Sequence, residues 1–180
     1  MIINLSELKN YLNITTTDND WILNILLDCA NDYVYWFLGR TIHLANYTEY
    51  KNGDGQRDFI LDNYPVNNLI GIYKNIGDNE TEDWEIIEPT KYKLEAKTGK
   101  IFLNFYKTRG FQNYKIVYNA GYETIPGDLK LATLKIAGGY YNKRNTDGIS
   151  SESVAGDSIS FNVSDLGGDV LNILNNYRDV

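Results

Sequence analysis

The stretch that decides the fold is Ile125-Pro126-Gly127-Asp128-Leu129, where a helical pattern begins after a long strand-like region. Proline suits the first position of a helix, because its missing N–H would have no partner there. Asp128 follows two residues later, where a negative charge favours the helix N-terminus. The apolar spacing after it predicts a helix that continues to about Arg144. Gly138-Gly139 within this helix predicts the close approach of another backbone.

Two helices are predicted before the strand-like region. The first runs from Ser6 to Asn13, with Ser6 as its N-cap. The second starts at a capping box formed by Thr17-Asp18-Asn19-Asp20 and continues to Leu38, with Gly39 directly after its C-terminus. These helices and the one that starts at Pro126 predict a single bundle that the strand-like region interrupts.

The second helix has apolar residues on more than one face. Its polar positions are Asn24, Asp28, Asn31 and Tyr35, whose spacing predicts one narrow solvent-facing stripe. A helix with two apolar faces needs a cover for the second face, either the β-region or another subunit. It is equally the pattern of a central helix in a monomeric core.

Residues 41–120 have the alternation typical of strands. Residues 45–51 alternate, Asn52-Gly53-Asp54-Gly55 forms a tight turn, and Asp58-Phe59-Ile60-Leu61 resumes the pattern, which predicts a β-hairpin. Further strands are predicted at 68–74, 84–87, 92–95, 100–105 and 114–118. The region is therefore expected to be an antiparallel sheet system of about six or seven short strands.

The C-terminal part begins with the helix from Pro126 and continues with a polar, Ser/Gly-rich stretch at 145–157, which predicts a mobile loop. Residues 158–163 alternate like a short strand, and residues 169–178 form a closing helix. The predicted fold class is α+β, a small helical bundle with an inserted antiparallel β-region. The predicted parts are the bundle helices at 1–40, the insertion at 41–120 and the returning helices at 121–180.

Composition narrows the classes of function. The chain has 180 residues, a formal net charge of −7 and a pI near 4.7, which argues against general affinity for nucleic acid. No run approaches the roughly 18–20 apolar residues that span a bilayer, so no membrane partner is expected. Tyrosine occurs 15 times, and aromatic side chains are enriched in interfaces as well as in sheets.

The residues that could carry catalysis are few. His43 is the single histidine, and it gives no basis for a triad or a metal site. Cys29 lies mid-helix among apolar residues and is interpreted as an inert core thiol. Asp28 and Asp32 share a helical face that is interpreted as solvated, and Gly53-Asp54-Gly55 lacks the setting of a phosphate-binding loop. We therefore expect no enzyme activity, no cofactor and no metal.

Two classes of function remain open from these residues. One is a self-assembling structural protein. The other is a non-catalytic binding module that holds a glycan or a peptide on its Tyr/Trp-rich β-region.

A family resemblance lies mainly in residues 117–160. It includes Val117-Tyr118-Asn119-Ala120-Gly121-Tyr122, Ile125-Pro126-Gly127-Asp128-Leu129-Lys130, Ala132, Tyr140-Tyr141-Asn142-Lys143-Arg144, Gly148-Ile149-Ser150-Ser151-Glu152-Ser153 and Gly156-Asp157-Ser158-Ile159-Ser160. Asn63-Tyr64-Pro65-Val66 and the opening helices fit longer members of the same family. The chain thus resembles the head–tail connector (adaptor) proteins of tailed bacteriophages.

The resemblance implies a ring of about a dozen subunits beneath the portal of the capsid. Such a ring joins the portal protein to the next protein, a stopper or tail-completion protein, and lets DNA pass through its channel without specific binding. It also implies a location in the virion, with assembly in the host cytoplasm, and no catalytic residues. An acidic surface suits such a channel, because attraction to phosphate would retain the DNA.

The resemblance also implies roles for particular residues. The C-terminal segment commonly reaches towards the portal, so portal contacts are expected at Leu171, Leu174, Tyr177 and Arg178. The helices with wide apolar faces are expected to pack against neighbouring subunits through Trp21, Ile25, Trp36, Leu134, Gly138 and Tyr141.

Overall fold

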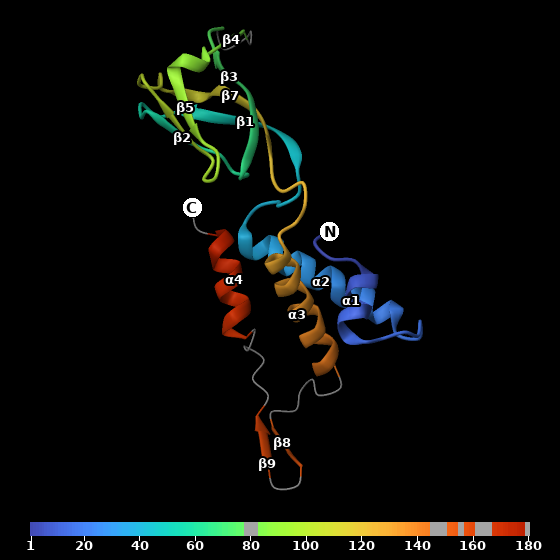
Figure 1. The fold of residues 1–180 in the computed structure, drawn as a ribbon. Coiled ribbons are helices and arrows are strands. Elements are labelled where there is room, and N and C mark those ends of the chain that lie inside the picture. Colours follow the sequence, from blue (N-terminus) through green and yellow to red (C-terminus); the bar gives the residue numbers. More distant parts are fainter. Residues whose placement is uncertain (78–82, 145–150, 155–156, 161–166, 179–180) are drawn as a thin grey trace. The chain divides into compact units, whose positions relative to one another are not determined.

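The computed structural model describes residues 1–77, 83–144, 151–154, 157–160 and 167–178. The chain divides into two compact units (Figure 1): a helical unit of residues Met1–Gly39 and Ile125–Val180, and a β unit of residues Arg40–Thr124. The sequence placed the inserted region at 41–120. Four helices and antiparallel sheets confirm the predicted α+β class.

The helical unit contains α1 (Leu5–Leu12), α2 (Asp20–Leu38), α3 (Gly127–Lys143) and α4 (Gly168–Arg178). The N-terminal ends of α1 and α2 are capped differently from the prediction. Asn4, not Ser6, caps α1, because its side chain accepts the Glu7 N–H at 3.0 Å while the Glu7 carboxylate accepts the Asn4 N–H at 2.9 Å. Asn19 precedes α2 and makes no side-chain capping bond. Gly39 ends α2 in the left-handed region at φ 66°, as predicted.

The core of the helical unit lies between α2 and the three other helices. Its fully or almost fully buried side chains include Leu8 of α1, Leu23, Leu27, Ala30 and Val34 of α2, Leu129, Ala132 and Ile136 of α3, and Val170 and Leu174 of α4. They recur at helical spacing on one face of each helix. Their burial stabilises the packing of the four helices by about 25 cal/mol for each Å² of apolar surface removed from water.

The predicted polar stripe of α2 is wrong at Asn31, whereas Asn24 and Asp28 are exposed as predicted. The Asn31 side chain is 4% exposed and lies on the core face. Its carbonyl oxygen accepts the Ile2 N–H at 2.6 Å and the Ile3 N–H at 3.4 Å, and its amide donates to the Leu27 carbonyl at 2.8 Å. A buried polar group needs such partners, so Asn31 fastens the N-terminal segment to α2 rather than facing solvent.

The described residues of the β unit form seven strands in two antiparallel sheets. They are β1 (Ala45–Gly53), β2 (Asp58–Ile60), β3 (Val66–Asn75), β4 (Trp84–Ile86), β5 (Tyr92–Glu95), β6 (Lys100–Leu103) and β7 (Gly110–Ala120), with a 3-10 turn at Pro89–Lys91. The strand orders are β1-β7-β3-β4 and β2-β6-β5. The predicted hairpin across Asn52-Gly53-Asp54-Gly55 is wrong, because β1 pairs with β7 and β2 pairs with β6.

Strand β7 organises this unit. It lies between β1 and β3, and its residues alternate between buried and half-buried from Tyr114 to Ala120. Tyr114, Ile116 and Tyr118 are fully buried and meet Phe59 and Ile101 of the smaller sheet in one core. The two sheets therefore share a single apolar interior.

The chain enters and leaves the β unit through two segments that bond to each other. The Leu44 N–H donates to the Tyr122 carbonyl at 3.2 Å, and the Tyr122 N–H donates to the Ile42 carbonyl at 2.8 Å. Gly121 adopts φ 106°, and a Cβ there would lie 2.3 Å from the His43 carbonyl oxygen, so only glycine fits.

A short hairpin follows α3. Strands β8 (Ser151–Val154) and β9 (Asp157–Ser160) pair antiparallel with each other. The prediction of a loop over 145–157 is therefore wrong at 151–154 and at Asp157, while residues 145–150 and 155–156 lie outside the described residues. The predicted strand over 158–163 is confirmed at 158–160, and its residues 161–163 lie outside the described residues. Among the described helices, none combines the length and apolar character that crossing a membrane requires.

Candidate functional site

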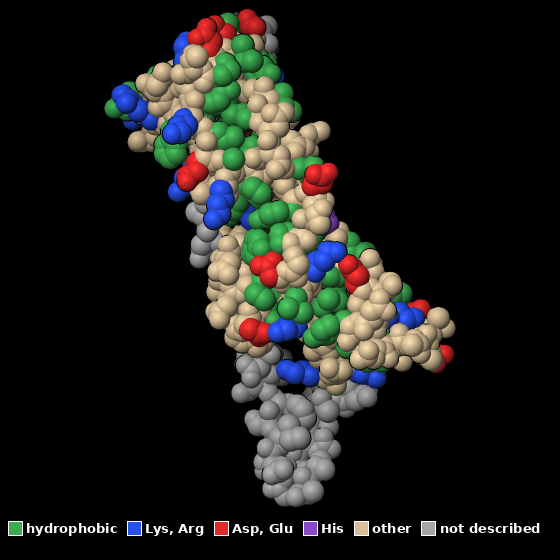
Figure 2. All heavy atoms as spheres, viewed as in Figure 1, with side chains coloured by type: hydrophobic (Ala, Val, Ile, Leu, Met, Phe, Trp, Pro, Cys, Tyr) green, Lys and Arg blue, Asp and Glu red, His purple; other side chains and the backbone are tan. Residues whose placement is uncertain are grey.

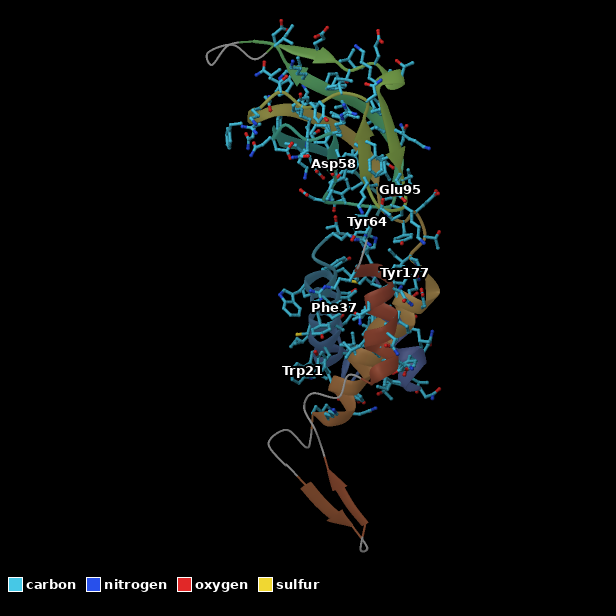
Figure 3. The ribbon with its side chains drawn as sticks, turned by 90° about the vertical axis from the view of Figure 1, so that its left-hand side faces the viewer. Trp21, Phe37, Asp58, Tyr64, Glu95 and Tyr177 are labelled. Atoms are coloured by element: carbon cyan, nitrogen blue, oxygen red, sulfur yellow. The ribbon has the colours of Figure 1, made fainter. Side chains whose placement is uncertain are left out.

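An uncovered apolar row runs along α2. The side chains of Trp21, Ile25 and Trp36 are 67%, 50% and 76% exposed, and Cys29 is exposed between them. These four positions, which we call the outer stripe, follow one flank of the helix opposite its buried face. Figure 3 shows Trp21 on this flank. Within the helical unit, α2 therefore buries one apolar face and leaves the second one exposed.

Acidic side chains flank the outer stripe. Asp28 and Asp32 are exposed and lie beside it, and α2 contains no Lys or Arg. Tyr33 packs its ring 5.9 Å from that of Trp36, which helps to hold this indole in place. Cys29 is exposed here, so its interpretation as a core thiol is wrong. Large exposed apolar side chains of this density are typical of surfaces that bind another protein.

The predicted interface residues of α3 lie in different environments. Leu134 and Tyr141 are half-buried, and the nearby Leu131 is 41% exposed. Gly138 is buried, and a Cβ there would lie 3.0 Å from the ring of Tyr11 in the same chain. The close neighbour of Gly138 is thus an aromatic side chain of α1 rather than a backbone, and Gly138 serves internal packing.

The predicted portal-contact residues of α4 also separate into two groups. Leu174 is fully buried between α4 and the rest of the helical unit, so its side chain is not accessible for a contact outside the chain. Leu171 is half-buried and Arg178 is exposed, with its guanidinium 5.1 Å from the ring centre of Phe37. The half-buried Tyr177 donates its hydroxyl to the Asp128 carboxylate at 2.7 and 2.8 Å, which ties the end of α4 to the start of α3.

A groove of about 1210 Å³ opens between α2 and α3. Leu26, Cys29 and Tyr33 form its α2 wall, while Gly138, Gly139 and Tyr140 belong to its α3 side. A Cβ at Gly139 would meet nothing within 4 Å, so the missing side chain leaves open space. Burial raises the pKa of the Tyr140 hydroxyl, and the nearby Tyr33 and Cys29 raise it further. This groove was not predicted, because it depends on how helices distant in sequence pack.

The β unit has an aromatic cluster on its larger sheet. The rings of Tyr50 and Trp84 lie 5.8 Å apart, and the Lys115 ammonium lies 4.6 Å from the Trp84 ring and 4.9 Å from the Tyr73 ring. A Cβ at Gly71 would lie 2.9 Å from the Tyr73 ring, so this glycine lets the ring lie over the strand. The side chains pack on one another and on the lysine rather than standing as separate stacking platforms.

The described residues show no cluster that could bind a metal ion. No group of three or more His, Cys, Asp or Glu side chains is placed to hold an ion in the part of the chain that the structure describes. His43 forms a backbone bridge with Tyr122 at the edge of the β unit. Figure 2 shows hydrophobic side chains among acidic and basic ones on the visible face of each unit.

Comparison with known proteins decides the family. The model of the head completion protein family matches residues 1–180, the full length of the chain.

The chain belongs to the head completion protein family.

This membership confirms the resemblance to connector proteins that residues 117–160 indicated. None of the curated proteins matches this head completion protein.

Solved structures share its fold. A chain in the neck of a native GTA particle, computed with C12 symmetry, superposes with a TM-score of 0.61 at 15% identity and covers 99% of this chain and 90% of that chain. A chain in the neck of an empty GTA particle, computed with C6 symmetry, gives 0.60 at 14% identity with the same coverage. A chain of the virion of a native gene transfer agent particle gives 0.59 at 15% identity, again over 99% and 90%. At these identities the likeness is one of fold.

Proposed function

We propose that this head completion protein is a non-enzymatic subunit of a ring at the junction of capsid and tail in a phage or phage-like particle. Family membership over residues 1–180 carries the proposal. Two observations support it: the fold resembles chains from particle necks computed with C6 and C12 symmetry, and α2 carries the exposed outer stripe. A ring of about a dozen copies needs each copy to offer two different surfaces to its neighbours.

The outer stripe is one of these surfaces in our proposal. Burial of Trp21, Ile25 and Trp36 against a neighbour would remove large aromatic and aliphatic area from water, and such residues dominate the energy of protein interfaces. The second surface is the patch of α3 around Leu131, Leu134 and Tyr141, which is also apolar and partly exposed. Gly138 is left out of it, because this residue contacts Tyr11 of its own chain.

The C-terminal helix is the part that meets the portal protein in our proposal. Leu171, Tyr177 and Arg178 retain exposed surface for such a contact, whereas Leu174 does not. The Tyr177–Asp128 bond holds the end of α4 in place, so that its outer surface is preorganised for binding. A stopper or tail-completion protein would bind on another side of the ring.

Charge supports the passage of DNA without retention. The helical unit has six Lys and Arg against twelve Asp and Glu, whereas the β unit has eleven against twelve. The excess of negative charge therefore lies in the helical unit, which we propose lines the DNA channel. Like charges on channel wall and phosphate weaken adhesion.

Ring formation tests the proposal. Electron microscopy and light scattering of the protein mixed with its cognate portal should show rings of about a dozen copies on the portal. Trp36→Lys and Trp21→Lys should abolish these rings while leaving the circular dichroism spectrum unchanged. Phe111→Lys is the matched control, because Phe111 is 81% exposed on the β unit and outside the proposed interface. A wild-type protein that stays monomeric with the portal present would contradict the proposal.

A further inference from the structure

The groove between α2 and α3 has the size of a polypeptide site. Its volume of about 1210 Å³ exceeds the roughly 300–1,000 Å³ of small-molecule sites. One wall carries Leu26 and Tyr33, and Gly139 on the α3 side leaves room where a side chain would stand. Apolar walls that are exposed to water are unfavourable, and covering them with another apolar segment lowers the free energy.

The groove is also the basic part of an acidic unit. Lys135, Lys143 and Arg144 line it, and they are half of the six Lys and Arg residues of the helical unit. Lys135 is paired with Asp169, and the Arg144 guanidinium lies 3.7 Å from the centre of its neighbour Tyr141. Basic side chains also appear in Figure 2 at the end of this unit where α3 ends and α4 begins. The fitting occupant is therefore an acidic, partly apolar chain segment.

The hairpin β8–β9 has this chemistry. Its register pairs Glu152 with Ile159 and Val154 with Asp157, and these pairs alternate with the serine pairs 151–160 and 153–158. The sequence from 145 to 167 contains four acidic residues and no Lys or Arg. Within the described residues, β8 and β9 form a sheet of two strands only. An isolated two-stranded hairpin is at best marginally stable in water and needs a surface to pack on.

We infer that the β8–β9 hairpin of one copy docks into the α2–α3 groove of the neighbouring copy. The inference rests on the proposed ring. The groove is continuous with the outer stripe, because Cys29 belongs to both, so a copy that covers the stripe lies beside the groove. Arg144 and Gly167, which bracket the hairpin in the sequence, line the groove of the same chain. Docking in the next copy links each subunit to its neighbour around the ring.

The single cysteine of the chain provides the test. Cys29 lies in the groove wall, so Ile159→Cys should form a disulfide with Cys29 of the neighbour in assembled rings. Non-reducing electrophoresis after mild oxidation should show dimers and longer ladders. The same Ile159→Cys change combined with Cys29→Ser, mixed with wild-type protein, should give heterodimers. Ser158→Cys, at the alternate register position, should give a several-fold lower yield.

Three results would overturn the inference. The first is a disulfide confined within single chains, which would place the hairpin in its own groove. The second is an equal yield from Ser158→Cys, and the third is intact rings without any disulfide from Ile159→Cys. The third result would leave the proposed function standing, whereas a wild-type protein that forms no rings would contradict both the proposed function and this inference.

A charge exchange gives a second test that does not depend on cysteine geometry. The double change Lys143→Glu with Arg144→Glu should lower the disulfide yield of Ile159→Cys at least several-fold, because it places acid against acid. Adding Glu152→Lys and Asp157→Lys should restore the yield. Failure of this second pair to restore it, in protein that still forms rings, would contradict the charge pairing.

Discussion

The hydroxyl of Tyr118 on β7 donates a hydrogen bond to the carboxylate of Glu49 on β1. The same hydroxyl accepts the Asn63 N–H at 3.3 Å. The Glu49 carboxylate in turn accepts the Asp62 N–H at 3.1 Å and pairs with the Lys51 ammonium at 2.9 Å. The core strand, the edge strand and the segment after β2 are thereby joined at one buried phenol.

Tyr118→Phe should lower the free energy of unfolding of the β unit by about 1.5–3 kcal/mol at pH 7, the range for a hydrogen bond to a charged group. Burial raises the pKa of the Tyr118 hydroxyl, and Glu49 raises it further. The folded state therefore holds this proton more tightly than the unfolded state. Its contribution is complete below the usual tyrosine pKa of about 10 and is lost as the pH rises through the raised value. Urea unfolding at pH 7 and above pH 10 should show the gap between wild type and Tyr118→Phe narrowing. Tyr50→Phe, at an exposed tyrosine, should change stability by less than about 0.5 kcal/mol.

Asn31→Ala should destabilise the helical unit by about 1–3 kcal/mol, because it removes the acceptor of two N-terminal N–H groups. Asn24→Ala on the exposed side of the same helix is the control and should cost less than about 0.5 kcal/mol. Amide hydrogen exchange at Ile2 and Ile3 provides the local measurement. Equal stability of the two variants would show that Asn31 does not hold the N-terminal segment.

Gly139→Ala should stabilise the protein by about 0.5–1 kcal/mol, because alanine is the better helix former and its Cβ enters open space. Gly138→Ala gains the same propensity, but its Cβ would lie 3.0 Å from the Tyr11 ring, which must shift. Thermal unfolding of the two variants should therefore rank Gly139→Ala above Gly138→Ala. The reverse order would contradict the packing of Tyr11 on α3.

Leu174→Ala should cost about 2–5 kcal/mol, because it leaves a cavity at a fully buried site. Leu171→Ala, one turn earlier and half-buried, should cost clearly less. The opposite ranking is expected for portal docking: Leu171→Asp should weaken docking while the helical unit stays folded. If Leu174→Ala stayed fully folded and still lost portal docking, Leu174 would have to be a portal contact.

Local signals in the sequence gave the helices and most strands. Strand β5 (Tyr92–Glu95) and the Gly39 terminus of α2 were predicted to the residue, since both depend on neighbours along the chain. The prediction of a hairpin across Asn52–Gly55 was wrong, because β1 pairs with β7 along its whole length. Turn residues alone do not reveal a partner that lies so far away in sequence. The predicted solvent exposure of Asn31 was wrong for a related reason, because its partners Ile2 and Ile3 lie far away in sequence.

The candidate surfaces were only partly accessible from sequence. The excess of apolar residues on α2 indicated an uncovered second face, and Trp21, Ile25 and Trp36 are exposed there. Leu174 shares the helical face of the buried Val170, whereas Leu171 lies beside that face. The resemblance grouped both leucines as portal contacts, and only the packed structure shows that Leu174 is not accessible. The groove arises from helices distant in sequence and from a glycine without a neighbour, and no local pattern encodes it.

The backbone bonds between Tyr122 and residues 42–44 have a consequence for how such proteins diversify. These bonds hold the first and last residues of the β unit next to each other. The β unit is therefore an insertion between two helices of the bundle that starts and ends at neighbouring points. A gene could lose, gain or exchange the β unit at one pair of splice points without changing the four-helix core, so that the helical unit stays constant while the β unit varies from one relative to another.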